Sequence, residues 1–168
     1  MTTVIARELR GAAGDLAEVG RLVLACSAAS LRRRFWLGGE PDPAEILARY
    51  QRFFLAGPPD GVALLALVDG TPAGLLNLVP DTTPRLAELG VLVADPWQRR
   101  GLGNGLTGWL RRSGRWRGWT VHASVQDNNG AAIALLRRHG FRRLPPAEPG
   151  QHDYDLVLRE EAHAEVTA

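Results

Sequence analysis

Lysine is absent from this 168-residue sequence, and all 20 of its basic residues are arginines. A Walker A phosphate loop needs a lysine, as does catalysis through a Schiff base or pyridoxal phosphate, so these sites are excluded. The single cysteine, Cys26, excludes an internal disulfide and any cysteine-based zinc site. Cys26 lies in an apolar segment, which predicts a buried core residue. We therefore expect a reducing, cytoplasmic setting and no metal site.

Long apolar runs are missing as well. No stretch approaches the roughly 20 residues of a membrane span, and the N-terminus lacks the basic patch and apolar core of a signal peptide. The net charge is only +2, which gives a nucleic-acid partner no support. One alternative stays open, because tryptophans that alternate with arginines over residues 109–119 could stack on bases. The lack of long apolar runs and the low net charge together predict a protein with no membrane and no nucleic-acid partner.

The pattern of apolar residues predicts one domain over residues 1–159 and a polar tail over residues 160–168. Strands are expected at residues 4–9, 62–68, 73–79, 86–94, 119–125, 154–158 and in a short stretch from residue 141. Helices are expected to begin at residues 15, 43, 101 and 131. Helices that fall between strands in the second half favour a mixed α/β (α+β) sheet of six to seven strands with about four helices. The arginines at residues 32–34 fit a solvated loop, although they could also attract an acidic substrate.

The segment from Val93 to Gly105 carries the clearest chemistry. A strand ends, a tight turn follows, and a helix begins at glycines 101, 103 and 105. Glycine lets the backbone approach a ligand, and the free N–H groups and dipole of a helix start favour an anion. Arg99 and Arg100 add positive charge. We interpret this turn as a pyrophosphate site, and the alternative is a glycine-rich helix start with solvated arginines. A dinucleotide does not fit, because the spacing differs from the dinucleotide motif, whose third glycine is replaced by Leu106.

Two segments resemble one known family. Residues 98–103 (QRRGLG) resemble the Q/R-x-x-G-x-G/A signature of the GNAT superfamily of N-acetyltransferases. Residues 129–141 are similar to that family's N-x-x-A-I-x-L-Y-x-K/R-x-G-F segment, which follows one strand later. The resemblance is strong over residues 86–143 and weak over residues 4–158. It implies a central sheet whose fourth and fifth strands splay apart, and Gly90 fits a bulge at the start of that splay.

The resemblance also implies a binding mode for acetyl-CoA as cosubstrate. In the family, backbone groups of the fourth strand pair with the pantetheine arm, and the signature turn binds the pyrophosphate. By this resemblance, the cofactor-binding residues are Val91, Leu92, Val93, Gln98, Arg99, Arg100, Gly101, Leu102, Gly103, Asn104 and, on the pantetheine, Asn129. A backbone N–H near Val91 or Leu92 would stabilise the oxyanion.

Glu88 is the expected general base. It is the only carboxylate in the apolar strand 86–93, where apolar surroundings would disfavour its charged form and raise its pKa. Its position also resembles that of the base in several family members. The alternative is a glutamate on a solvated face. The general acid is harder to assign, because Leu136 stands where many members have a tyrosine, and Tyr154 on the last strand is the nearest substitute.

Together these features predict an N-acetyltransferase that moves the acetyl group of acetyl-CoA to a primary amine by direct attack. The acceptor stays open between a protein N-terminus, an amino acid, a polyamine and an antibiotic. Leu136 keeps a second class of function open, a non-catalytic acyl-CoA-binding sensor. A homodimer is plausible, because the final strands of this fold often pair.

Overall fold

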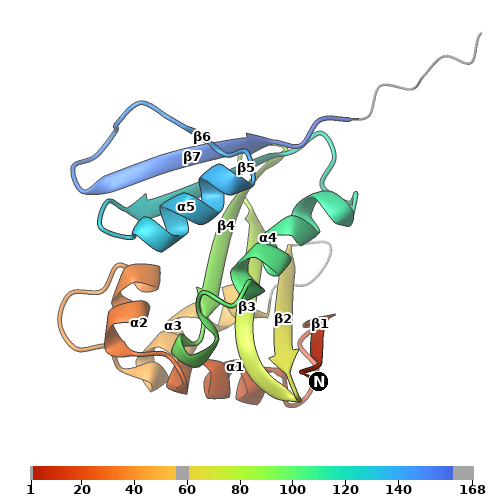
Figure 1. Cartoon of the computed structure of the whole chain (residues 1–168), viewed down its shortest axis with the longest axis vertical. Coiled ribbons are helices and arrows are strands. Elements are labelled where there is room, and N and C mark those ends of the chain that lie inside the picture. Colours follow the sequence, from red (N-terminus) through yellow and green to blue (C-terminus); the bar gives the residue numbers. More distant parts are fainter. Residues whose placement is uncertain (1, 56–60, 161–168) are drawn as a thin grey trace, which may run out of the picture.

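The computed structural model describes residues 2–55 and 61–160, which form a seven-stranded sheet and five α-helices (Figure 1). In chain order the elements are β1 (Val4–Glu8), α1 (Asp15–Leu24), α2 (Ala28–Phe35), α3 (Pro43–Phe54), β2 (Val62–Val68), β3 (Thr71–Pro80), β4 (Leu86–Val93), the 3₁₀ turn η1 (Asp95–Trp97), α4 (Leu102–Arg112), β5 (Thr120–Gln126), α5 (Gly130–Arg138), β6 (Arg142–Arg143) and β7 (Gln151–Val157). The predicted mixed sheet is confirmed. The polar tail predicted over residues 160–168 lies, apart from Glu160, outside the described residues, and the single domain over residues 1–159 stays a prediction.

The strands follow the order β1-β2-β3-β4-β5-β7-β6 across the sheet. All neighbours are antiparallel except β4 and β5, which run parallel. The predicted hairpin between β2 and β3 turns at Asp69 and Gly70, whose φ angles are 47° and 79°. Positive φ at both positions matches the twist of paired strands, which is why Asp-Gly is a strong hairpin signal.

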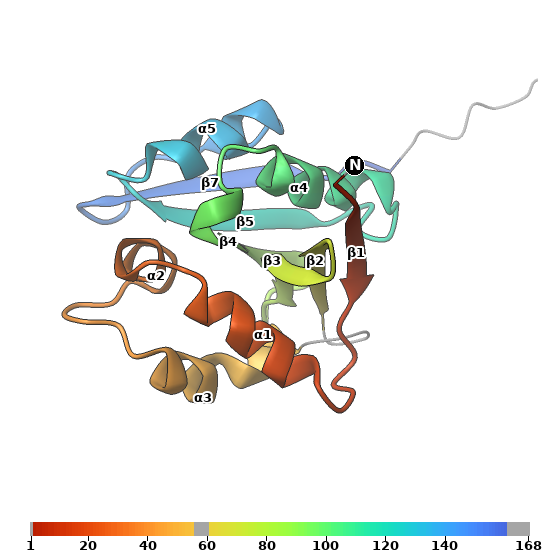
Figure 2. The same cartoon turned by 60° about the horizontal axis from the view of Figure 1, so that its bottom comes forward.

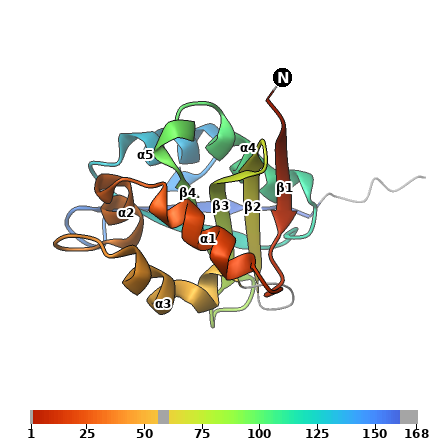
Figure 3. The same ribbon diagram turned by 90° about the horizontal axis from the view of Figure 1, so that it is seen from below.

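Helices cover both faces of the sheet. α1, α2 and α3 lie on one face and α4 and α5 on the other, as Figure 2 shows. Figure 3 looks onto the first face, where α1 crosses β3 and packs against it. Within the described ranges, no helix has the length and apolar character that a membrane crossing requires.

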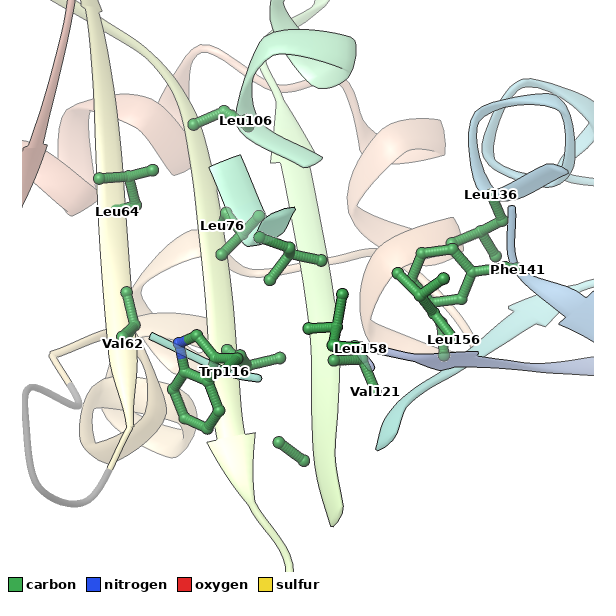
Figure 4. Close-up of a cluster of buried hydrophobic side chains, with 14 of the residues drawn as sticks. Val62, Leu64, Leu76, Leu106, Trp116, Val121, Leu136, Phe141, Leu156 and Leu158 are labelled. Atoms are coloured by element: carbon green, nitrogen blue, oxygen red, sulfur yellow. The ribbon is translucent and has the colours of Figure 1, made fainter. Parts of the chain in front are cut away.

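Each face of the sheet has its own apolar core. On the α4–α5 face, Leu106, Leu110 and Leu136 pack with Val121 and Tyr154 of the strands. Figure 4 shows Leu106, Leu136 and Val121 of this cluster. On the opposite face a second cluster joins the first three helices to β2 and β3. Cys26 belongs to that second cluster and is buried, as predicted. Burial, with the negative charge of Asp95 nearby, raises the pKa of the Cys26 thiol to about 12, so this thiol is not a nucleophile at neutral pH.

The tryptophans of residues 109–119 belong to the first core. Trp116 is buried in this core (Figure 4). It meets Trp119 edge-on, with ring centroids 4.9 Å apart. Trp109 and Trp119 pack against the same cluster. The aromatic rings that a nucleic-acid platform would need are therefore used in packing.

The first half of the sheet turns away from the second half. β4 and β5 pair only over Leu86–Glu88 with Thr120–His122. Beyond these residues the two strands diverge, so the splay that the family resemblance implies is present (Figure 1). β3 and β4, in contrast, stay paired from Gly74 with Val93 to Pro80 with Ala87.

Helix α2 is the element that the sequence prediction missed. The arginines of residues 32–34 lie in its last turn rather than in a loop. Ser27 caps the helix, since its side chain accepts the backbone N–H of Ser30 at 3.2 Å. Leu31 and Phe35, four residues apart, are its buried anchors. The three consecutive arginines between Leu31 and Phe35 made this apolar spacing difficult to recognise in the sequence. With α2, the described residues form five helices instead of the expected four or so.

Candidate active site

The divergence of β4 and β5 opens a cleft of about 910 Å³. Such a volume is typical of pockets that bind small molecules and cofactors, which span roughly 300–1,000 Å³. Its walls come from β4, β5, α2, the turn that follows η1, and α5. Of the residues predicted to act in catalysis or cofactor binding, those that line it are Glu88, Val91, Leu92, Val93, Gln98, Arg99, Gly101, Gly103, Asn104 and Asn129. Arg100, Leu102 and Tyr154 do not line it.

The β4 wall of the cleft is an open strand edge. Within the described residues, β5 has no pairing partner in β4 beyond Glu88. The backbone groups of residues 89–93 that point toward β5 are therefore free of sheet hydrogen bonds, and an extended ligand can pair with such an edge. The predicted bulge at Gly90 is wrong, because Gly90 pairs in unbroken register with Asn77.

The turn after β4 forms an anion cradle. Arg99 and Gly101 both have left-handed backbone angles, with φ of 57° and 84°. Alternation of right- and left-handed residues turns successive N–H groups into one concave nest. Gly101 is the N-cap of α4, and in the described chain no side chain caps this helix. The N–H groups of its first turn and its dipole are thus available to a phosphate.

Two polar side chains of this turn are engaged within the protein. The amide of Gln98 donates to Ser30 Oγ and to the Val93 carbonyl, both at 3.0 Å. Asn104 Oδ1 lies 2.9 Å from His139 Nε2. Arg100 stacks on Trp97, 5.3 Å from the ring centroid. Backbone groups, rather than the side chains of Gln98 and Asn104, are therefore what this turn presents to a ligand.

Asn129 has a similar local role. It caps α5, since its side-chain oxygen accepts the backbone N–H of Ala132 at 3.3 Å. The residue lines the cleft, but the cap commits one side-chain oxygen lone pair. A contact from Asn129 to the pantetheine arm would use its amide group or backbone.

Helix α2 is tied to the anion cradle. The carboxylate of Asp95, in η1, accepts the backbone N–H and the hydroxyl of Ser27, each at 2.8 Å. Burial acts to raise the pKa of Asp95, but the hydrogen bonds from Ser27 and Ser30 outweigh it and hold this pKa below its usual value. A charged Asp95 therefore joins the start of α2 to the turn, and α2 reaches across to contact both β4 and β5.

A row of polar residues crosses the sheet where the cleft begins. Glu88 of β4 stands beside His122 of β5, which in turn stands opposite Asp155 of β7. Residues side by side in register point to the same face of a sheet, and here that face is the one covered by α2. His122 Nδ1 lies 2.7 Å from Asp155 Oδ1. Glu88 is solvent-exposed in the cleft, which differs from the apolar surroundings expected for it.

His122 is held on its other side as well. Its Nε2 lies 3.3 Å from Ser124 Oγ and 3.5 Å from Asp153 Oδ1. Ser124 donates to Asp153 at 2.6 Å. Burial acts to raise the pKa of Asp153, but hydrogen bonds from Ser124 and Gln151, together with His122, keep that pKa below its usual value. The imidazole is therefore fixed between two carboxylates beside Glu88.

Tyr154 is not placed to act at the cleft. Its side chain is fully buried in the core of the α4–α5 face, because the alternation of β7 turns residues 154 and 156 away from the cleft and residues 153 and 155 toward His122. Within the described residues its hydroxyl has no hydrogen-bond partner. Leu136 is buried too, but it forms part of the cleft wall.

Two features of the site escaped sequence reasoning. The His122–Asp155 pair could have been found from the alternation of β5 and β7, which sets both residues on polar faces, but only the register brings them together. The position of Arg34 against Gly90 depends on α2, so no local signal could reveal it.

The sequence itself matches a known family. Residues 27–141 match the acetyltransferase (GNAT) family. This segment spans α2 to the end of α5 and includes the cradle, the open strand and the row of Glu88 and His122. No curated protein sequence matches the chain significantly.

Solved structures share the fold over almost the whole chain. The GNAT domain of PAT from S. lividans is 23% identical, with 90% of this chain and 88% of that chain covered and a TM-score of 0.74. The putative acetyltransferase yncA from Salmonella typhimurium, solved with its cofactor acetyl-CoA, is 22% identical over 98% and 99% of the two chains, with a TM-score of 0.68. The ribosomal-protein-S18-alanine N-acetyltransferase from Escherichia coli is 18% identical over 98% of each chain, with a TM-score of 0.65.

Proposed function

The chain belongs to the acetyltransferase (GNAT) family, and from that premise we propose that it is an acetyl-CoA-dependent N-acetyltransferase acting on a primary amine. The observation that carries this proposal is the split between β4 and β5. It places an open strand edge between the anion cradle at Gly101 and the polar pair of Glu88 and His122. Binding groups and a proton acceptor therefore share one cleft.

The residues present fit acetyl-CoA. The nest around Arg99 and Gly101 suits a pyrophosphate, which is dianionic and accepts several N–H bonds at once. The edge of β4 that faces β5 over residues 89–92 has no sheet partner there and suits the amide groups of a pantetheine arm. Support from the comparisons comes from yncA, whose structure holds acetyl-CoA. We assign the cradle to the pyrophosphate and the strand edge to the arm.

Glu88 is the proposed general base. When bound, acetyl-CoA supplies an activated acyl group: the amine nitrogen bonds to the carbonyl carbon, the carbon–sulfur bond breaks, and CoA leaves. Glu88 accepts the first proton from the substrate ammonium. The second N–H proton, released as the amide forms, neutralises the departing thiolate. Glu88 is exposed in the cleft and, among the described residues, has no ion pair or hydrogen bond that would compete for this proton.

The groups around Glu88 have supporting roles in this proposal. His122 is held in place by Asp155 and borders the space that the amine must enter. In this proposal it orients the polar groups of the amine substrate. A backbone N–H of Val91 or Leu92 donates to the oxyanion that develops on the acetyl group. Neither Leu136 nor Tyr154 supplies a proton, so the thiolate is neutralised by the proton released from nitrogen.

Oligomeric state and location are each proposed from one feature of the chain. Val157 of β7 is 60% exposed, and an exposed apolar residue near the end of the sheet suits pairing with a second copy. We propose a homodimer on this basis, which light scattering at micromolar concentration tests. We also propose a cytoplasmic protein, because the sequence has one cysteine.

Turnover and binding together test the proposed activity. The purified protein is mixed with acetyl-CoA and a panel of amino acids, amino-acid amides, polyamines and N-terminal peptides, and release of free CoA is followed with a thiol reagent. Calorimetry with acetyl-CoA alone is measured in parallel. We expect binding together with amine-dependent CoA release. Binding without turnover on any amine would instead favour the acyl-CoA sensor, and no binding would contradict both functions.

A further inference from the structure

Arg34 is an unpaired cation inside the cleft. It lies in the last turn of α2, is half-buried, and lines the cleft together with Glu88 and Gly90. In the described part of the chain it forms no ion pair and no hydrogen bond, and its Nε is buried without a partner. A buried donor that lacks an acceptor is costly, since it has lost its water. The guanidinium of Arg34 therefore offers its N–H groups to an anionic ligand in the cleft.

Arg32 differs from Arg34. It lies two residues earlier in α2, on nearly the opposite side of the helix, where it pairs with Glu40 at 3.5 Å and donates to the Gly39 carbonyl at 3.3 Å. It does not line the cleft. The contact of Arg34 is instead the face of Phe35, 4.8 Å from its ring centroid, which leaves the N–H fork of the guanidinium without an acceptor. Burial lowers the pKa of Arg34 to about 10, so the group remains charged at neutral pH.

The guanidinium of Arg34 lies directly against the backbone of Gly90. A Cβ at residue 90 would lie 2.6 Å from Arg34 Cζ and closer still to one of its terminal nitrogens. Any side chain here would therefore push the guanidinium off β4. The glycine is needed for this close approach rather than for a bulge, since the strand register is unbroken.

The position of this cation relative to Glu88 defines a substrate. Residues 88 and 90 of β4 are on the same face, about 7 Å apart along the strand, so Arg34 and Glu88 act on one side of the same strand. An ammonium group is drawn to the carboxylate, and an anionic group is drawn to the guanidinium. A planar carboxylate is the natural partner of the guanidinium fork.

We propose that the acceptor is a small amine that carries a carboxylate, with Arg34 binding the carboxylate while Glu88 faces the ammonium. This inference rests on the proposed acetyltransfer and names its substrate class, an amino acid or a close analogue. Arg34 is then a specificity-determining residue. Trp36 and Tyr50, which also line the cleft, are placed to contact the remainder of the substrate.

The wild-type protein provides the first test. Each of the common amino acids is compared with its own carboxamide, which keeps the amine and the side chain and replaces the carboxylate with an uncharged amide. For the amino acids that are acetylated, we expect kcat/KM to exceed that of the carboxamide by about 10- to 100-fold, the size of a charge-assisted hydrogen bond. Equal or better use of the carboxamides would overturn the inference, while turnover of no amine at all would count against the acetyltransfer itself.

Variants provide the second test. Arg34→Gln is expected to raise KM for the amino acid about 10- to 100-fold and to leave KM for the carboxamide nearly unchanged. Gly90→Ala, which keeps the charge but displaces it, is expected to act in the same direction. Arg32→Gln is the matched control and should leave both substrates unaffected, because Arg32 lies outside the cleft.

A purely structural role of Arg34 would give a different pattern. Arg34→Gln would then lower the melting temperature and slow both substrates by the same factor. Circular dichroism on each variant shows whether it is folded. Should Arg34→Gln not fold, the comparison of amino acid with carboxamide in the wild type and in Gly90→Ala decides the inference.

Discussion

Asn104 and His139 join the two helices that follow the open strands, because Asn104 Oδ1 accepts from His139 Nε2 at 2.9 Å. Asn104 lies in the first turn of α4, and His139 is the C-cap of α5. Burial lowers the pKa of His139, and the positive charges of Arg138, Arg111 and Arg112 lower it further. His139 is therefore held in its neutral form at neutral pH.

The neutral form of His139 makes stability depend on pH. The unfolded chain takes up a proton on this residue near its ordinary pKa of about 6.5, whereas the folded chain resists protonation to lower pH. The free energy of unfolding should therefore fall as pH decreases below about 6.5. Urea titrations at pH 7.5 and 5.5 check this against His139→Gln, which keeps an N–H donor for Asn104 but does not titrate. An equal loss of stability in the wild type and His139→Gln would contradict the lowered pKa.

Glu88→Gln tests the general base. The substitution keeps the shape of the side chain and removes its ability to accept a proton, so turnover should fall by about 10²- to 10⁴-fold. Calorimetric affinity for acetyl-CoA should be unchanged, because Glu88 lies at the start of the splay and the cradle lies at Gly101. Full turnover in Glu88→Gln at every pH from 6 to 9 would show that another group, or water, removes the proton.

Gly101→Ala and Gly105→Ala separate backbone strain from helix propensity. Gly101 has a φ of 84°, and an alanine Cβ would meet no protein atom within 4 Å there. The left-handed conformation alone should cost Gly101→Ala about 1–2 kcal/mol of stability and weaken acetyl-CoA binding, because the cradle depends on this angle. Gly105 lies within α4 and its Cβ would also meet open space, so Gly105→Ala should raise stability by about 0.5–1 kcal/mol. Thermal melts and calorimetry compare the two, and equal effects would contradict a role for the Gly101 angle.

Tyr154→Phe tests whether the sequence-based candidate for the acid has any role. The Tyr154 hydroxyl is buried and, among the described residues, has no partner. Removing it should leave turnover unchanged and keep or raise the free energy of unfolding by up to about 1 kcal/mol. A large loss of turnover with an unchanged melting temperature would show that Tyr154 reaches the reacting sulfur after all.

Local patterns were enough to predict much of this fold. The Asp-Gly hairpin, the apolar strand over residues 86–93 and the glycine-rich helix start at Gly101 each have a local physical signature, and each is present. Asp42 likewise caps α3, accepting the Ala44 N–H at 2.9 Å, with Pro43 in the first turn. Such features depend on a few adjacent residues, so a single sequence reveals them.

The contents of the cleft were harder to predict, because they depend on pairings between distant segments. Glu88 was identified from its place in an apolar strand, but its exposure follows from the divergence of β5, which no local pattern encodes. Tyr154 was chosen for its strand and failed because alternation turns it to the opposite face. Asp155, one residue further along, is the one that meets His122 across 33 residues of sequence.

The short contact between β4 and β5 has a mechanical consequence. Among the described strands, the three residue pairs between β4 and β5 are all that join the first four strands to the last three within the sheet. A ligand bound in the cleft beyond these three pairs would contact both β4 and β5 and so connect the two halves of the sheet. We therefore expect acetyl-CoA to slow amide hydrogen exchange in β4 and β5 on both sides of the gap, and to make the two halves unfold together.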